Sequence, residues 1–144
     1  MIRLTRSYDP FIDRDQGFCA EFTFFRSCLI LPSEGRPVKL ESVGEVIAAR
    51  ALMLLRDRGA ASEVLVLLGK PQQLPDHQDY YCPYQIKGAG PEKVRYACGI
   101  DPFQALQLAL STLGVELEVL NKELGGKLRW ECDAKGGLGF PDFA

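Results

Sequence analysis

The last third of the sequence contains a helix whose two ends are both marked, and this feature constrains the fold most. Asp101 is a favoured N-cap, Pro102 suits the first helical position, and Gln104 completes a capping box. A glycine pair at 125–126 ends the helix. Apolar residues between these ends recur at steps of three and four: Phe103, Leu106, Leu110, Leu113, Leu117, Leu120 and Leu124. A single stripe of this kind predicts a helix that packs on one face of a sheet.

The stretch before the helix, "YYCPYQIKGAGPEKVRYACGI" at residues 80–100, predicts an antiparallel hairpin. Similar residue types stand at equal distances from Gly90: Ile86 and Val94, Tyr84 and Tyr96, Cys82 and Cys98. This symmetry predicts that the two members of each pair lie opposite each other on the face that the helix covers. Alternation then places Tyr81 and Gln85 on the other face.

Residues 43–58 permit two interpretations. Ser42 and Glu45 have capping-box spacing, and Ala and Leu dominate the residues after them, so local propensity favours a helix. The alternative is a hairpin in which a strand at 45–55 pairs with "EVLVLLG" at 63–69. The latter segment is a strand in both interpretations, and "KLRWEC" at 127–132 also predicts a short strand.

We expect the N-terminal residues to form an arm or hairpin that belongs to the same folding unit as the rest of the chain. Phe18, Ala20, Phe22 and Phe24 alternate, which is typical of a strand, and "LPSEGRP" at 31–37 interrupts the chain. We therefore expect an arm over residues 1–43 and an α+β domain over residues 44–144.

Composition and charge exclude several classes of function. The chain has 144 residues, enough for one domain, and its net charge of -2 with a pI of about 5.5 does not suit nucleic-acid binding. The N-terminus has no apolar core of a signal peptide, and no apolar run is long enough to cross a membrane. We expect a cytoplasmic protein with no nucleic-acid or membrane partner.

The five cysteines include no C-x-x-C pair, which argues against a zinc module and a secreted disulfide framework. In the predicted register, Cys82 and Cys98 would lie within reach of a disulfide. Since neither has a basic neighbour in sequence that would activate it, we interpret them as small, reduced core residues.

The sequence contains no recognisable set of catalytic residues. The loop "KGAGPEK" joins two strands and matches neither a phosphate-binding nor a dinucleotide-binding pattern. A lone histidine, in Asp76-His77-Gln78-Asp79, cannot form a His-based zinc site. We expect no catalytic residues, no metal site and no cofactor.

Four motifs together resemble a family of small bacterial proteins of unknown function: "CPYQIKGAG", "GIDPFQALQLAL", "KLRW" and "LGFP". The resemblance covers about residues 44–141 and implies a ββββα arrangement. It favours a strand near residues 48–55, against the local helix propensity. The overall expectation is an α+β fold with a mainly antiparallel sheet of four to five strands and one long helix on one face. The family implies no activity.

These features favour a non-catalytic protein-binding module, such as an immunity protein that neutralises a basic toxin domain. Aromatic residues in excess of one helix–sheet interface, among them Tyr80, Tyr81 and Trp130, are typical interface anchors. The candidate partner-binding residues are Asp76, His77, Asp79, Tyr80, Tyr81 and Glu92. One alternative is a small-ligand-binding protein or enzyme that uses the Asp76-His77-Asp79 loop. Another is an accessory or oligomerisation domain, and the chain would be a monomer or homodimer.

Overall fold

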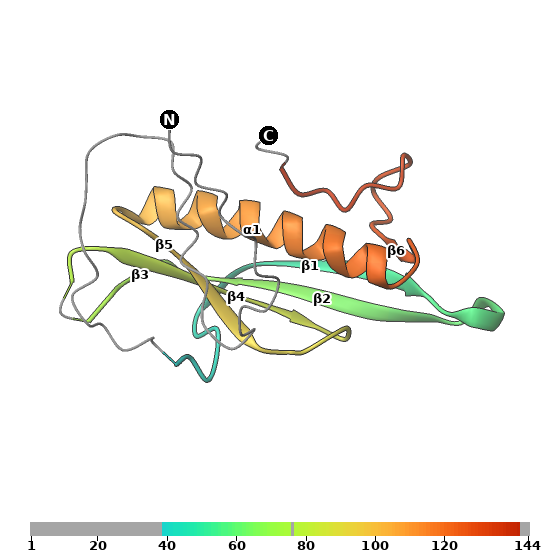
Figure 1. Ribbon diagram of the computed structural model, residues 1–144, viewed down its shortest axis with the longest axis horizontal. Helices are drawn as coiled ribbons and strands as arrows, with labels where there is room; N and C mark the ends of the chain where they lie inside the picture. The colour runs from blue at the N-terminus through green and yellow to red at the C-terminus, as the bar shows by residue number, and fades with distance from the viewer. Residues whose placement is uncertain (1–38, 76, 142–144) are drawn as a thin grey trace, which may run out of the picture.

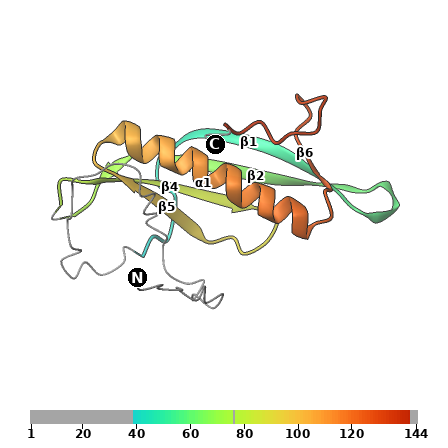
Figure 2. The same cartoon turned by 45° about the horizontal axis from the view of Figure 1, so that its top comes forward.

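The structure, a computed structural model, describes residues 39–75 and 77–141. A six-stranded antiparallel sheet carries one long helix on one face (Figures 1 and 2), which confirms the α+β class. Strand β4 lies between β2 and β5, β1 lies beside β2, and β6 pairs with β1, while the short β3 pairs with the start of β4. The elements are β1 (Val46–Leu55), a 3-10 turn (Asp57–Gly59), β2 (Ala61–Gly69), β3 (Gln72–Gln73), β4 (Tyr80–Lys87), β5 (Val94–Gly99), α1 (Pro102–Glu123) and β6 (Leu128–Arg129).

Residues 43–58 contain a strand, as the family resemblance implied, and the helix that local propensity favours is wrong. β1 pairs with β2 from Val46 opposite Gly69 to Leu55 opposite Ala61. Helix propensities differ by only about 0.7 kcal/mol per residue among ordinary side chains. Backbone pairing with β2 and burial of alternate leucines under α1 outweigh a preference of that size.

The core lies between α1 and the face of the sheet below it, which we call the helix face. Strands β1, β2 and β4 contribute alternate residues to this core, and β5 and β6 contribute one buried residue each. The buried set comprises Leu52, Leu54, Val64, Val66, Leu68, Cys82, Tyr84, Ala97, Ala105, Ala109, Leu113, Leu117, Leu128 and Leu138.

The two predicted ends of α1 are confirmed. The Asp101 carboxylate accepts a hydrogen bond from the backbone N–H of Gln104 at 2.9 Å, and the Gln104 side-chain oxygen accepts one from Ile100 N–H at 2.8 Å. At the other end, Gly125 and Gly126 both have positive φ, which favours glycine.

The predicted apolar stripe is wrong at its start, where Phe103 is 80% exposed. The helix instead lies on the sheet through Ala105 and Ala109, which are fully buried. A Cβ on Gly99 would lie only 2.8 Å from the carbonyl carbon of Gln104, so the helix backbone sits directly against β5. At this distance only small residues fit between the two elements.

The hairpin of β4 and β5 is confirmed, but its register differs by one residue from the predicted symmetry about Gly90. The observed partners are Cys82 with Ala97, Pro83 with Tyr96 and Tyr84 with Arg95. Because side chains alternate, this shift moves Tyr96 and Cys98 to the face opposite α1. It brings Gly99 under the helix, where a larger residue would collide with the backbone of Ala105.

The C-terminal segment packs on the edge of β1 through Arg50. The Arg50 guanidinium lies 4.3 Å from the centre of the Trp130 ring and 4.7 Å from that of Phe140. It also donates hydrogen bonds to the carbonyl oxygens of Leu138, at 3.3 Å, and Gly139. These contacts hold the end of the described chain against the sheet.

By length and composition alone, α1 is long and apolar enough to cross a membrane. Core helices of soluble proteins often meet the same criterion. In this structure one side of α1 forms the core with the sheet. Two large apolar side chains on its other side, Val115 and Val119, are 59% and 50% exposed.

Candidate functional site

The predicted binding loop between β3 and β4 is a short turn closed by its own backbone. Leu74 N–H donates to the Asp79 carbonyl at 2.9 Å, and His77 N–H donates to the Leu74 carbonyl at 3.3 Å. The Gln73 side chain donates to the His77 carbonyl at 3.1 Å. His77 is exposed and Asp79 half-buried, while Asp76 lies outside the described residues.

The two tyrosines that follow this loop lie on opposite faces of the sheet. Tyr80 is half-buried and packs against the core on the helix face. Tyr81 is only 9% exposed, so the prediction that it is an exposed anchor is wrong. Its hydroxyl donates to the Gln72 side-chain oxygen at 3.1 Å, and its ring meets that of Tyr96 edge-on, with 6.0 Å between centres.

Glu92 lies at the opposite end of the hairpin from this loop. Its carboxylate accepts a hydrogen bond from Gly88 N–H at 2.7 Å, and its carbonyl accepts one from the Gln85 side chain at 2.7 Å. The eight residues of β4, about 25 Å of extended chain, separate Glu92 from His77. The candidate residues in the described part of the chain therefore do not form one surface.

Two strongly exposed apolar residues lie at the same end of the sheet as this loop. Ile100 is 71% exposed and Phe103 is 80% exposed. Tyr80 pairs directly with Gly99, so the β3–β4 loop and the turn into α1 leave the same end of the sheet. We name His77, Asp79, Tyr80, Ile100 and Phe103 the end surface.

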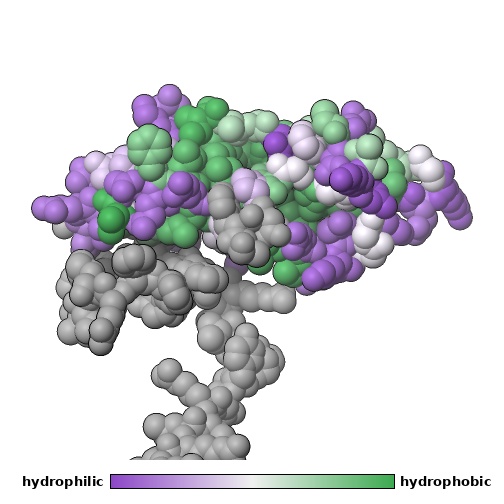
Figure 3. Space-filling model, turned by 90° about the horizontal axis from the view of Figure 1, so that it is seen from above, coloured by the Kyte–Doolittle hydropathy of each residue, from purple (hydrophilic) through white to green (hydrophobic). Residues whose placement is uncertain are grey.

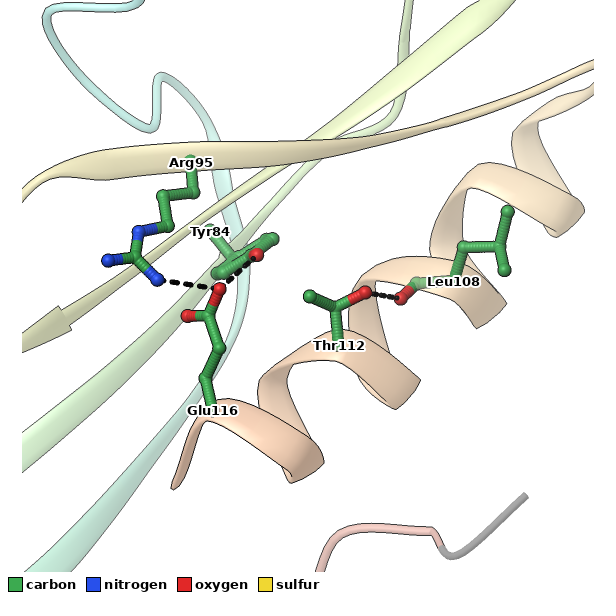
Figure 4. Close-up of polar contacts among 5 residues, drawn as sticks. All are labelled: Tyr84, Arg95, Leu108, Thr112 and Glu116. Atoms are coloured by element: carbon green, nitrogen blue, oxygen red, sulfur yellow. Dashed lines mark hydrogen bonds and ion pairs between the residues drawn. The ribbon is translucent and has the colours of Figure 1, made fainter. Parts of the chain in front are cut away.

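A polar cluster joins α1 to the hairpin on the helix face (Figure 4). The Tyr84 hydroxyl donates to Glu116 Oε1 at 3.0 Å, and Arg95 Nη1 lies 2.6 Å from the same oxygen. Burial, reinforced by the Glu116 carboxylate and opposed by Arg95, raises the pKa of Tyr84 far above its ordinary value. A phenol held protonated and fully paired does not suit proton transfer, so the cluster serves to fasten the helix.

Cys82 and Cys98 do not form a redox pair with each other, because they lie on opposite faces of the sheet. Cys82 lies on the helix face, where its thiol donates to the Gly69 carbonyl at 3.4 Å, whereas Cys98 lies opposite Tyr81 on the other face. Burial raises the pKa of the Cys82 thiol to about 12. Such a thiol is a poor nucleophile, consistent with its role as a core residue.

Neither a metal centre nor a deep pocket is evident in the part of the chain that the structure describes. Within residues 39–75 and 77–141, no three His, Cys, Asp or Glu side chains come together as metal ligands. A shallow depression near the end of β1 is lined by Leu54, Leu55, Arg56, Asp57, Leu124 and Lys127. The Lys127 amine and the Asp57 carboxylate pair there at 2.7 Å, and none of the predicted site residues lines it.

Comparison with known proteins identifies a family whose function is unknown. The family model of a domain of unknown function, DUF6968, matches residues 48–142. No curated protein matches the chain. No solved structure matches it either.

Proposed function

Since the chain belongs to the DUF6968 family, whose function is unknown, we propose a function on physical grounds: it is a non-catalytic protein-binding module that docks through its end surface. The observation that carries this proposal is the exposure of Ile100 and Phe103, at 71% and 80%. Burying an apolar side chain of this size in a partner contributes about 1.5–3 kcal/mol.

The chemistry of the end surface favours a partner with an apolar socket and a basic rim. Asp79 directly precedes Tyr80, whose strand partner Gly99 directly precedes Ile100, and Asp101 lies between Ile100 and Phe103 in sequence. The chain as a whole carries a net charge of -2. Complementary charge at the rim would accelerate association, and apolar anchors at the centre would supply affinity.

Toxin neutralisation is the specific form of this function that we propose. An immunity protein acts by covering a catalytic cleft and requires no catalytic residues of its own. A basic cleft is the complement of an acidic surface with apolar anchors. The alternative of a ligand site in the Asp76-His77-Asp79 loop has less support, since the described part of this loop is a turn with an exposed histidine and no pocket around it.

Two pairs of exposed apolar residues, one at the start of α1 and one along its exposed side, allow a matched test. The double variant Ile100→Asn and Phe103→Ser removes the anchors, and Val115→Ser with Val119→Ser removes two exposed apolar side chains elsewhere. Calorimetry would measure binding of the full-length chain to the protein encoded by the neighbouring gene. We expect the first variant to bind at least about tenfold more weakly and the second to bind as the wild type does.

The same measurement has outcomes that contradict the proposal. Absence of binding between the wild type and every neighbouring gene product would do so, as would equal losses in both double variants. Both variants should unfold within about 0.5 kcal/mol of the wild type, because the altered side chains are mostly exposed. Association that slows as salt is raised would support the acidic rim.

A further inference from the structure

The face of the sheet opposite α1, which we call the far face, also carries apolar side chains at its centre. Its central residues are Met53, Leu65, Leu67, Tyr81, Pro83 and Tyr96. Within residues 39–75 and 77–141, no helix or strand lies over it, since α1 packs on the other side. A sheet with two apolar faces is typical of a middle layer that is covered from both sides.

Some far-face residues are nevertheless well buried. Tyr81 and Tyr96 are each 9% exposed, and Pro83 is among the fully buried side chains. Neither tyrosine belongs to the core beneath α1. Neighbours within a single sheet leave the outer side of a tyrosine ring open, so a burial of nine tenths indicates a covering layer.

The chain enters the described structure on this same face. Val43 is 5% exposed and lies directly over Gly69, where a Cβ would come within 2.6 Å of the Val43 carbonyl oxygen. The same Cβ would lie 2.6 Å from the Pro83 ring. Glycine at position 69 thus allows Val43, in the segment before β1, to pass across the far face. The chain that leads to Val43 therefore approaches the sheet from this face.

We propose that residues 18–31 pack across the far face as its covering layer. This segment, "FCAEFTFFRSCLIL", is the most apolar part of the chain before residue 39. Alternation places Phe18, Phe22 and Phe24 on one side, which supplies the aromatic surface that Tyr81 and Tyr96 require.

The dimensions permit this arrangement. The four strands β1, β2, β4 and β5 span about 14 Å at an ordinary strand spacing, and the seven residues 18–24 extend about 23 Å. The eleven residues 32–42 that connect this segment to Val43 reach at most about 40 Å. They include Pro32, Gly35 and Pro37, residues that favour the turn needed to fold back.

Site-specific cross-linking in the full-length chain tests the proposal. A photoreactive benzoylphenylalanine at Leu67, half-buried on the far face, should cross-link to residues 18–31 within the same chain, as mass spectrometry of intact protein and peptides would show. The matched control at Val115, exposed on α1, should give no such cross-link. Cross-links between two chains, or none to residues 18–31, would overturn the proposal.

Cys98 provides a second measurement on the far face. The test uses a chain that retains only Cys98 and the buried Cys82, with the other three cysteines replaced by serine. In this chain, Phe22→Asp with Phe24→Asp should raise the rate of Cys98 alkylation by about tenfold. Phe25→Asp, on the other side of the alternation, should change that rate much less. An equal rate in the wild type and the Phe22/Phe24 variant would refute the covering layer.

Discussion

Both faces of the sheet carry apolar side chains, but they differ in how completely these are buried. On the helix face, Leu52 and Val64 are completely buried, and Gly99 lets the backbone of α1 touch β5. On the far face, Leu65 and Leu67 are half-buried, and burial is concentrated around Tyr81 and Tyr96. The helix face is thus a closed core, whereas the far face keeps half-buried apolar side chains and the end surface keeps exposed ones.

The exposed side of α1 and the end surface differ in how far their apolar side chains are exposed. On the face seen in Figure 3, hydrophobic residues lie next to hydrophilic ones. Ile100 and Phe103 are more exposed than Val115 and Val119. A small apolar centre bordered by polar groups is typical of protein-binding surfaces.

The largest expected effect separates the two faces by stability. Leu52→Ala on the helix face should reduce the free energy of unfolding by about 3 kcal/mol, because it leaves a cavity in a closed core. Leu65→Ala on the far face should cost about half as much, since that side chain is only half-buried. Urea denaturation measures both, and equal losses would mean that the faces are packed equally well.

A smaller effect compares the two tyrosine hydroxyls. Tyr84→Phe removes a hydrogen bond to a carboxylate and should cost about 1.5–2 kcal/mol. Tyr81→Phe removes one to a neutral amide and should cost about 0.5–1 kcal/mol. The same denaturation series provides the measurement. A larger loss for Tyr81→Phe would contradict the view that the polar cluster on the helix face fastens α1.

The smallest effect concerns pH and the Cys82 thiol. Burial raises its folded-state pKa to about 12 from the ordinary value of 9.0, so the unfolded chain loses this proton first. The free energy of unfolding should therefore fall as pH rises from 9.0 toward 12, with Tyr84 acting in the same direction. Thermal melts at about pH 8 and pH 10 should show a smaller decrease for Cys82→Ala than for the wild type. An identical decrease would exclude Cys82 as a contributor.

Local signals in the sequence predicted the elements whose ends are marked by capping or turn residues. The cap at Asp101, the glycines after α1 and the hairpin between β4 and β5 all depend on neighbouring residues, and all are confirmed. The strand at β1 could not be inferred from propensity, because its alanines and leucines suit both structures and only pairing with β2 decides between them. The family resemblance supplied the information that the local pattern lacked.

The candidate site was harder to predict, because it depends on which elements end at the same place. Asp79 and Ile100 are twenty-one positions apart and lie at the same end of the sheet only because Tyr80 pairs with Gly99. Glu92 was grouped with them by charge, yet it stabilises the turn at the other end of the hairpin. Whether these residues bind a partner remains a prediction.

By itself, the sequence determined the α+β class, the helix with its caps, and a hairpin before it, since these depend on periodicity and on residues close together in the chain. Only the tertiary structure decided the register of β5 and the direction in which Phe103 points. A shift of one residue costs little in local propensity but exchanges the two faces of a strand. The choice was therefore made by the close contact of Gly99 with α1 and by the pairing of Arg95 with Glu116, which exist only when the helix lies on the sheet.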